Sequence, residues 1–304
     1  MHIGATALHY GQACFEGLKA FCHEDNSVHI FRPDENAKRL RSSCERIMMP
    51  FPSQEEFLQA CSTVVQDNIA FVPPYGSGGA LYLRPLLFGS GPRIGLQPAD
   101  EYTFLIMAIP VGDYYKGGLA SPVDGMIIRD FDRAAPRGVG NVKVAGNYAA
   151  DLLPNQQSKK KGYPIGLYLD AATQTMVEEF STSNFVGIDK ENKKYITPYA
   201  ERSVLPSITN KSLMTLAEKE LGFTVERRNI QLEELSTFDE VVACGTAVVV
   251  TPVGSLTDIN QDGEETKYTF GSEVGTTTRQ LFDTVRAIQF GEADDKFGWN
   301  YKVC

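Results

Sequence analysis

A segment rich in glycine and proline at residues 110–125 is the feature that most constrains how this chain can fold. Its sequence, PVGDYYKGGLASPVDG, has neither a helical nor a strand period and is typical of a linker. The chain has 304 residues, more than one compact core commonly serves. We therefore expect two unequal domains, with a small N-terminal domain at residues 1–115, a linker at 116–129 and a large C-terminal domain at 130–304.

Short apolar runs and helical patterns alternate on both sides of this segment. Strands are expected at residues 27–32, 81–83, 103–109, 126–128, 165–169, 184–188, 241–244 and 247–250. From Pro33, apolar residues recur every three or four positions, which predicts a helix. Ser53 followed by Glu56 predicts the capping box of a second helix. Further helices are expected at 209–221 and 275–290, so the pattern indicates a mixed α/β (α+β) fold.

The composition argues against several classes of protein. A net charge of −9 disfavours nucleic-acid binding, and the chain has no apolar run of about 18 residues that would predict a membrane span. All four histidines lie within the first 29 residues. A hydrolase with a histidine base or a histidine-bound zinc would have to take its histidines from this short segment, which argues against both classes. The six cysteines form no CxxC pair, which favours reduced thiols over a zinc ribbon or a disulfide scaffold. We expect no metal site.

Lys143 differs from most other lysines of the chain in its surroundings. It lies in GVGNVKVAGNYAADL between Val142 and Val144, whereas many of the others stand in polar runs. Apolar surroundings disfavour the charged amine and lower its pKa, and a neutral amine can form a Schiff base with an aldehyde cofactor. On the local context alone, however, a lysine that extends past two valines to solvent is the favoured interpretation.

Five stretches together resemble the branched-chain amino-acid aminotransferases: HYGQACFEGLKAF, LYLRPLLFG, GNVKVAGNYAADL, VEEFSTSNFVGI and ACGTAVVVTPV. The resemblance runs from His9 to the final DKFGWNYKV. It implies a class IV enzyme dependent on pyridoxal 5′-phosphate (PLP), with two unequal domains of fold type IV, the D-amino-acid aminotransferase type. Family members usually carry a segment before the HYG motif. We therefore expect a missing N-terminal piece, which leaves the compartment, cytoplasm or mitochondrion, open.

The resemblance assigns roles around the cofactor ring. Lys143 forms the Schiff base and moves the proton between the substrate Cα and the cofactor C4′. Glu179, five residues before Asn184, matches the carboxylate that holds the pyridine nitrogen, and Glu178 is expected to be its solvated neighbour. Tyr148 matches the tyrosine that hydrogen-bonds the phenolic oxygen. Two further positions near the ring are matched by Thr182 and Arg133.

The resemblance also implies a phosphate site. Arg39 in NAKRLRSS matches the phosphate arginine. Ile208 and Thr209 open a predicted helix, and the N–H groups of a helix start bind anions readily. The remaining matched positions are Gly245 and Thr246 of the CGTA motif.

A substrate pocket for a branched aliphatic side chain should be aromatic with few polar groups. The matched family positions are Tyr10, Phe15, Tyr82 and Tyr114, although each alone also fits a core aromatic residue. By the resemblance, Arg84 would hold the side-chain carboxylate of glutamate or 2-oxoglutarate. The N–H groups at Thr246 and Ala247 would hold the α-carboxylate.

We therefore expect transamination of leucine, isoleucine and valine with 2-oxoglutarate. The alternatives are a divergent aliphatic donor, D-amino-acid transamination, a 4-amino-4-deoxychorismate lyase, or a binding protein that has kept the fold without the activity. Some family members carry a redox CxxC after the GTA motif, but this chain has AVVV there. The resemblance further implies a homodimer, in which the loop Gly89–Leu96 contributes to the pocket of the neighbouring subunit.

Overall fold

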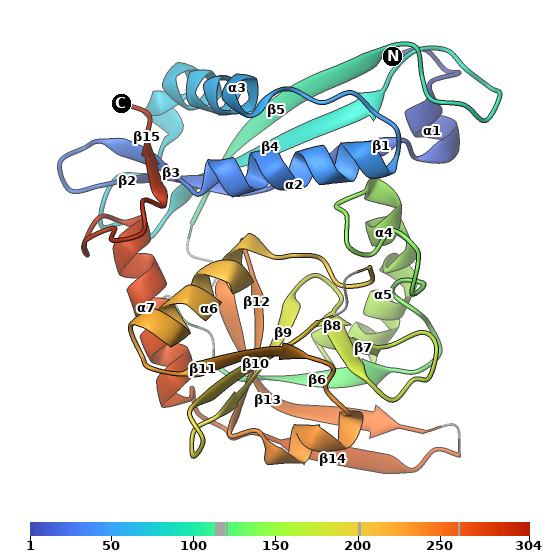
Figure 1. Cartoon of the computed structure of the whole chain (residues 1–304), viewed down its shortest axis with the longest axis vertical. Coiled ribbons are helices and arrows are strands. Elements are labelled where there is room, and N and C mark those ends of the chain that lie inside the picture. The colour runs from blue at the N-terminus through green and yellow to red at the C-terminus, as the bar shows by residue number, and fades with distance from the viewer. Residues whose placement is uncertain (113–118, 120, 200–201, 261) are drawn as a thin grey trace. The chain divides into compact units, whose positions relative to one another are not determined.

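The computed structural model describes residues 1–112, 119, 121–199, 202–260 and 262–304 (Figure 1). The chain divides into two compact units. Unit 1 comprises Met1–Tyr114, Val142–Tyr148 and Arg286–Cys304. Unit 2 comprises Tyr115–Asn141 and Ala149–Val285. The mixed α/β class expected from the sequence is confirmed.

Unit 1 is built on an antiparallel six-stranded sheet. Its strands are β1 (Ala13–Phe15), β2 (Leu18–Cys22), β3 (Val28–Phe31), β4 (Ala80–Gly89), β5 (Tyr102–Val111) and β15 (Asn300–Lys302). The strand order is β1-β4-β2-β3-β15, and β5 pairs with β4 along its whole length. Buried and half-buried positions alternate along most of β4, as expected for a strand with one face on a core.

The two helices predicted in unit 1, from Pro33 and from Ser53, are present, and two short helical elements were not predicted. The helical elements are α1 (Thr6–Tyr10), α2 (Pro33–Arg46), α3 (Gln54–Asp67) and the 3₁₀ turn η1 (Ile69–Phe71). The apolar stripe of α2 is buried through Ala37, Leu40 and Cys44. In α3 the Glu56 N–H donates to Ser53 Oγ and the Ser53 N–H donates to the Glu56 carboxylate, which confirms the capping box. Figure 1 shows α2 and α3 lying side by side.

Unit 2 is built on a nine-stranded sheet that closes on itself. Its strands are β6 (Val123–Ile128), β7 (Ile165–Leu169), β8 (Val177–Phe180), β9 (Asn184–Asp189), β10 (Lys194–Pro198), β11 (Thr224–Arg228), β12 (Glu240–Gly245), β13 (Val249–Ile259) and β14 (Glu265–Thr269). The order is β11-β10-β9-β12-β13-β6-β7-β8, with β14 on β13. Because β8 also pairs with β9, through Glu179 and Asn184, six strands form a closed ring.

An apolar core that includes Phe180, Phe185 and Leu256 packs the strands of unit 2 together. The remaining helices are α4 (Ala145–Ala150), α5 (Leu152–Lys160), α6 (Ile208–Lys219), the 3₁₀ segment η2 (Leu232–Thr237) and α7 (Thr276–Gln289). The predicted helices at 209–221 and 275–290 correspond to α6 and α7. No helix in the described part of the chain has the length and apolarity to cross a membrane.

The contiguous domain limits expected from the sequence differ from the units. Residues 123–128 of the expected linker form β6. Residues 142–148 belong to unit 1 because Val144 forms a β-bridge with Cys14 of β1. The C-terminal segment joins the same unit because β15 pairs with β3. Both connections are distant in sequence, so local composition could not reveal them.

Two stacked histidines join the β2–β3 hairpin of unit 1 to its C-terminal segment. The His23 and His29 rings lie 3.9 Å apart at 15°, and His23 Nε2 is 3.2 Å from the Gln289 carbonyl oxygen. The pKa of His29 is lowered from 6.5 to about 4, chiefly by burial and also by the charges of His23 and Lys302, against the opposing effect of Asp25 and Asp295. Burial also lowers the pKa of His23.

We expect unit 1 to lose stability as the pH falls from about 6.5 toward 4. In that range the unfolded chain takes up a proton that folded His29 resists, so protonation favours unfolding. The only tryptophan, Trp299, is buried against Phe31 and reports on this unit. The urea concentration at the unfolding midpoint, measured by Trp299 fluorescence, should decrease as the pH decreases. His29→Gln should reduce this pH dependence, whereas the exposed control His9→Gln should not. An unchanged pH slope in His29→Gln would contradict the assignment.

Candidate active site

The backbone of Lys143 is held by both β1 and α2. Phe15 N–H donates to the Lys143 carbonyl at 3.1 Å, and Lys143 N–H donates to Ser43 Oγ at 2.9 Å. The Ser43 hydroxyl donates in turn to the Arg39 carbonyl at 3.0 Å. The residues on either side of Lys143, Val142 and Val144, are buried. The Lys143 side chain is half-buried, so it does not simply extend past the two valines to solvent.

The Lys143 amine lies among aromatic side chains. Its Nζ donates to Tyr148 Oη at 2.7 Å. The same atom is 4.8 Å from the Phe15 ring centroid and 5.0 Å from that of Tyr148. The helix α4 begins at Ala145 and carries Tyr148 back toward the lysine. The structure therefore brings together three residues that the sequence analysis had selected.

Arg39 has a partner that the sequence analysis missed. Its Nε and Nη2 donate to the two carboxylate oxygens of Glu16, each at 2.8 Å, and both side chains are buried. Asn36 Nδ2 also donates to Glu16 at 2.7 Å. The only sequence signal was a glutamate between Phe15 and Gly17 in an otherwise apolar segment. Arg41, by contrast, is exposed and pairs with Glu45.

The expected substrate residues fall into separate groups. Arg84 donates to Tyr82 Oη from Nε at 3.2 Å and from Nη2 at 3.0 Å, and its guanidinium carbon lies 4.7 Å from the Phe15 ring centroid. The Tyr82 hydroxyl rests against Gly17, where an added Cβ would displace the Tyr82 side chain. Tyr114 lies outside the described residues.

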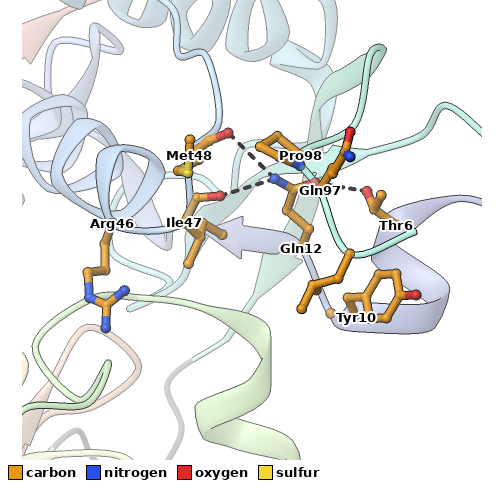
Figure 2. Close-up of a pocket in the computed structure, with 10 residues that line it drawn as sticks. Thr6, Tyr10, Gln12, Arg46, Ile47, Met48, Gln97 and Pro98 are labelled. Carbon is orange, nitrogen blue, oxygen red and sulfur yellow. Dashed lines mark hydrogen bonds between the residues drawn. The ribbon is translucent and has the colours of Figure 1, made fainter. Parts of the chain in front are cut away.

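Tyr10 lies in a different part of unit 1 from this group. It is half exposed on α1, and its hydroxyl donates to the Ile94 carbonyl. It lines an open cavity of about 370 Å³, together with Gln12, Met48 and Leu96 among others (Figure 2). The Gln12 amide is anchored there by the Ile47 carbonyl at 3.1 Å.

In unit 2, Glu179 is a buried carboxylate with several donors. Arg133 Nη1 lies 2.7 Å from its Oε1, and the Leu205 N–H donates to the same oxygen at 2.9 Å. Asn184 Nδ2 donates to Oε2 at 2.9 Å. The side-chain oxygen Oδ1 of Asn184 accepts from Asn210 Nδ2 of α6 at 3.3 Å. These donors stabilise the ionised form of Glu179.

The expectation that Glu178 is solvated is wrong. Its side chain is buried, and the Ser203 hydroxyl donates to its Oε1. The reason is a bulge in β8. Between the pairs Phe180–Leu167 and Val177–Leu169, β8 has two residues, Glu178 and Glu179, where β7 has one. A bulge interrupts the alternation of side chains and re-aims them, which the sequence pattern does not reveal.

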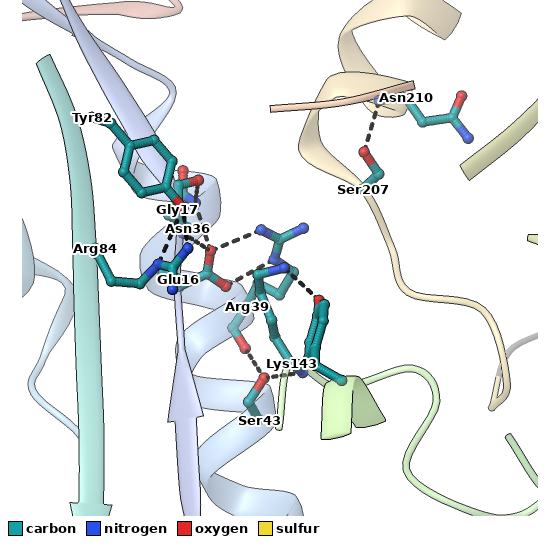
Figure 3. Close-up of polar contacts among 11 residues, drawn as sticks. Glu16, Gly17, Asn36, Arg39, Ser43, Tyr82, Arg84, Lys143, Ser207 and Asn210 are labelled. Carbon is teal, nitrogen blue, oxygen red and sulfur yellow. Dashed lines mark hydrogen bonds and ion pairs between the residues drawn. The ribbon is translucent and has the colours of Figure 1, made fainter. Parts of the chain in front are cut away.

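The other expected cofactor residues of unit 2 lie at the start of α6, in two turns and at the end of β12. Ser207 caps α6 by accepting from the Asn210 N–H at 3.2 Å, so Ile208 and Thr209 occupy the first turn, whose N–H groups lack intrahelical acceptors (Figure 3). Thr182 lies in the turn between β8 and β9. An added Cβ on Gly245 would lie 3.7 Å from the Thr182 carbonyl oxygen, so this turn adjoins the end of β12.

The second turn, residues 246–248, joins β12 to β13, so the predicted strand at 247–250 begins only at Val249. Thr246 and Ala247 lie in this turn. Val249 has φ 65°, a left-handed conformation that is uncommon for a β-branched residue and costs about 1–3 kcal/mol. Such strain occurs where surrounding contacts impose a turn shape. Among the described residues, no group of three or more His, Cys, Asp or Glu side chains could hold a metal.

Comparisons with known proteins agree on one family. Residues 13–256 match the family described as amino-transferase class IV. The chain is 46% identical to a branched-chain-amino-acid aminotransferase of Haemophilus influenzae, over 100% of this chain and 88% of that protein. It is 46% identical to one from Helicobacter pylori, over 99% and 86%. The crystal structure of the Escherichia coli branched-chain amino acid aminotransferase matches with a TM-score of 0.84 and 30% identity, covering 100% of this chain and 94% of that one.

Replacing Glu16 with glutamine should destabilise unit 1 strongly. The change removes the carboxylate partner of buried Arg39, which should lower the free energy of unfolding by about 3–5 kcal/mol. Urea unfolding monitored through Trp299 measures the loss. Glu45→Gln, which breaks the exposed pair with Arg41, is the matched control and should cost at most about 1 kcal/mol. Equal losses in the two variants would show that Glu16 does not stabilise the buried arginine.

Proposed function

This chain belongs to the class IV aminotransferase family, and from that premise we propose that it is a PLP-dependent aminotransferase of branched-chain L-amino acids. It would transfer the amino group of leucine, isoleucine or valine to 2-oxoglutarate. The observation that carries the proposal is Lys143, whose amine donates to Tyr148 from a backbone held by Phe15 and Ser43.

The groups present fit the functional groups of PLP. Lys143 supplies the amine for the aldehyde carbon, and Tyr148 a hydroxyl for the phenolic oxygen. Glu179 supplies a carboxylate for the ring nitrogen. It pairs with Arg133 and lies on β8, the strand that precedes Thr182. The phosphate would be held by Arg39, Ile208, Thr209 and the turn at Gly245 and Thr246. When bound, PLP supplies an electron sink for negative charge on the substrate Cα.

The residues of the chain would then do two things. Lys143, once its amine is free, would take the proton from the substrate Cα and deliver it to the cofactor carbon C4′, and the hydrogen bond with Tyr148 orients the amine for both transfers. Glu179 keeps a negative charge at the ring nitrogen, since three neighbouring groups donate to its carboxylate.

The substrate residues support a donor with an aliphatic side chain and an acceptor with a second carboxylate. Phe15 and Tyr82 offer aromatic faces, and Arg84 is stacked on Phe15 with its guanidinium fixed by Tyr82. Such a guanidinium suits the side-chain carboxylate of glutamate or 2-oxoglutarate. The turn at Thr246 and Ala247 would bind the α-carboxylate common to all substrates.

Borohydride reduction of the PLP-loaded protein should attach the cofactor to the peptide that contains Lys143. Lys143→Ala should abolish transamination, because no other residue is proposed to move the Cα proton, whereas the control Lys160→Ala on α5 should remain active. The rate with a panel of donors and 2-oxoglutarate tests the substrate. Leucine, isoleucine and valine should exceed D-alanine and aromatic donors. Label on another lysine, or a preference for D-amino acids, would contradict the proposal.

We further propose that the protein is a homodimer with two-fold symmetry. Exposed apolar side chains surround the cavity beside Tyr10: Met48 is 70% exposed, and Ile94 and Leu96 in the loop after β4 are 64% and 81% exposed. Packing against a second copy would remove this apolar surface from water. The loop Gly89–Leu96 would then contribute to the neighbouring subunit's pocket.

Leu96→Asp should weaken the dimer, because it places a charge in an apolar interface. Light scattering across a concentration series should show a dimer for the wild type and a larger monomer fraction for this variant. Ile69→Asp, at another exposed apolar position, is the control and should leave the dimer intact. A wild-type protein that is monomeric and fully active would refute the dimer proposal.

A further inference from the structure

Unit 2 buries two adjacent carboxyl groups with one arginine near them. Glu178 and Glu179 are 6% and 2% exposed, and the bulge in β8 places both opposite Tyr168. Arg133 pairs directly with Glu179, at 2.7 Å. The proposed function uses Glu179 alone, so the second buried carboxyl group has no role in it.

Ser203 connects Glu178 to the pair formed by Arg133 and Glu179. Its hydroxyl donates to Glu178 Oε1, and its carbonyl oxygen accepts from Arg133 Nη1 at 2.8 Å. The same Nη1 atom contacts Glu179 Oε1. Glu178 Oε2 is buried and has no hydrogen-bond partner among the described residues. One oxygen of this carboxyl group is thus tied to the arginine through a serine, and the other is unsatisfied.

The pKa of Glu178 is raised to about 7, chiefly by burial, so the group changes charge near neutral pH. The charge of Glu179 on the same strand and that of Asp170 directly after β7 contribute to the rise. The Ser203 hydrogen bond and the charge of Arg133 oppose the rise. The neighbouring β9 contributes the neutral Asn184.

A count of charges shows what this second carboxyl group can do. With Glu178 protonated, Arg133 and Glu179 form a neutral cluster. If Glu179 also held a protonated pyridine nitrogen while Glu178 stayed protonated, two cations, Arg133 and the nitrogen, would face one carboxylate. Ionised Glu178 restores neutrality, because two carboxylates then face two cations. The cluster therefore holds one titratable proton both without and with PLP. Without PLP the proton is on Glu178, and with PLP it is on the ring nitrogen. Exchange with solvent accounts for its removal from one group and its addition to the other.

We propose that Glu178 is a positioning residue for Glu179: its ionised form compensates Arg133 through Ser203 and leaves Glu179 to hold a protonated ring nitrogen. This inference rests on the proposed function, since it assumes that Glu179 binds the nitrogen of PLP. The inference goes beyond the proposed function because it gives Glu178, the adjacent buried carboxyl group, an electrostatic role in the same site.

Two spectroscopic readouts test the proposal without measuring turnover. The first is the nitrogen-15 chemical shift of ring-labelled PLP bound to the protein, followed as a function of pH, because it reports protonation of the ring nitrogen. The second is the infrared carbonyl stretch of a buried protonated carboxyl group. In the cofactor-free protein this band should disappear as the pH rises through neutrality, and loading with PLP should move its loss to lower pH. The band should be absent in Glu178→Gln.

Glu178→Gln is the decisive variant, because glutamine keeps an oxygen that accepts from Ser203 but removes the charge. The pKa of the ring nitrogen should fall by about one unit, the size of effect that one nearby charge has on a buried group. At pH values above the ring-nitrogen pKa, a loss of one unit lowers the protonated fraction about tenfold, so kcat should fall there by about that factor with KM nearly unchanged. Glu178→Asp should restore much of the wild-type titration, and the exposed control Glu233→Gln should leave it unaltered.

The outcomes separate this inference from the proposed function. If Glu179→Gln lowers the ring-nitrogen pKa and a folded Glu178→Gln does not, the role of Glu178 is refuted while that of Glu179 stands. If neither variant changes it, the assignment of Glu179 itself fails. Should Glu178→Gln not fold, Ser203→Ala decides: removing the donor makes Glu178 harder to ionise, so the nitrogen titration must move in the same direction. An unchanged titration in that variant refutes the inference.

Discussion

Two backbone hydrogen bonds, from Phe15 to the Lys143 carbonyl and from the Lys143 N–H to Ser43, set the geometry on which the rest of unit 1's site depends. They incorporate a segment from the middle of the chain into a sheet formed mainly by its N-terminal third. The amine then meets the aromatic rings of Phe15 and Tyr148 at fixed distances. Because the backbone is anchored on both sides of the Cα, only the side-chain torsions remain to be ordered.

Each unit also buries an arginine–carboxylate pair, and each pair has additional donors. In unit 1, Glu16 accepts from Asn36 as well as from Arg39. In unit 2, Glu179 accepts from Asn184 and from a backbone N–H as well as from Arg133. Removing charges from water is costly, and extra hydrogen bonds to the carboxylate offset that cost. The result in both units is a charge whose position is determined by several neighbours at once.

The sequence predicted those parts of the fold that depend on local pattern. The stripe of α2 and the capping box of α3 are read from residues three or four positions apart, and both are present. Motif matching selected Lys143, Tyr148 and Phe15, which do lie together. The bulge that buries Glu178 and the carboxylate beside Arg39 were missed, because each depends on a partner distant in sequence. The same holds for the unit limits, since no local signal pairs the last residues with β3.

That pairing bears on how the chain folds during synthesis. The strand β15 completes the edge of the unit 1 sheet, and the Val28 N–H donates to the carbonyl of Cys304. Unit 2 ends at Val285, so all of its residues leave the ribosome earlier. Synthesis of unit 1 therefore starts before that of unit 2 but is completed after it. The incomplete sheet edge of unit 1 at β3 stays open to other strands until β15 has been synthesised, and in that interval this edge of the nascent chain is exposed to mispairing.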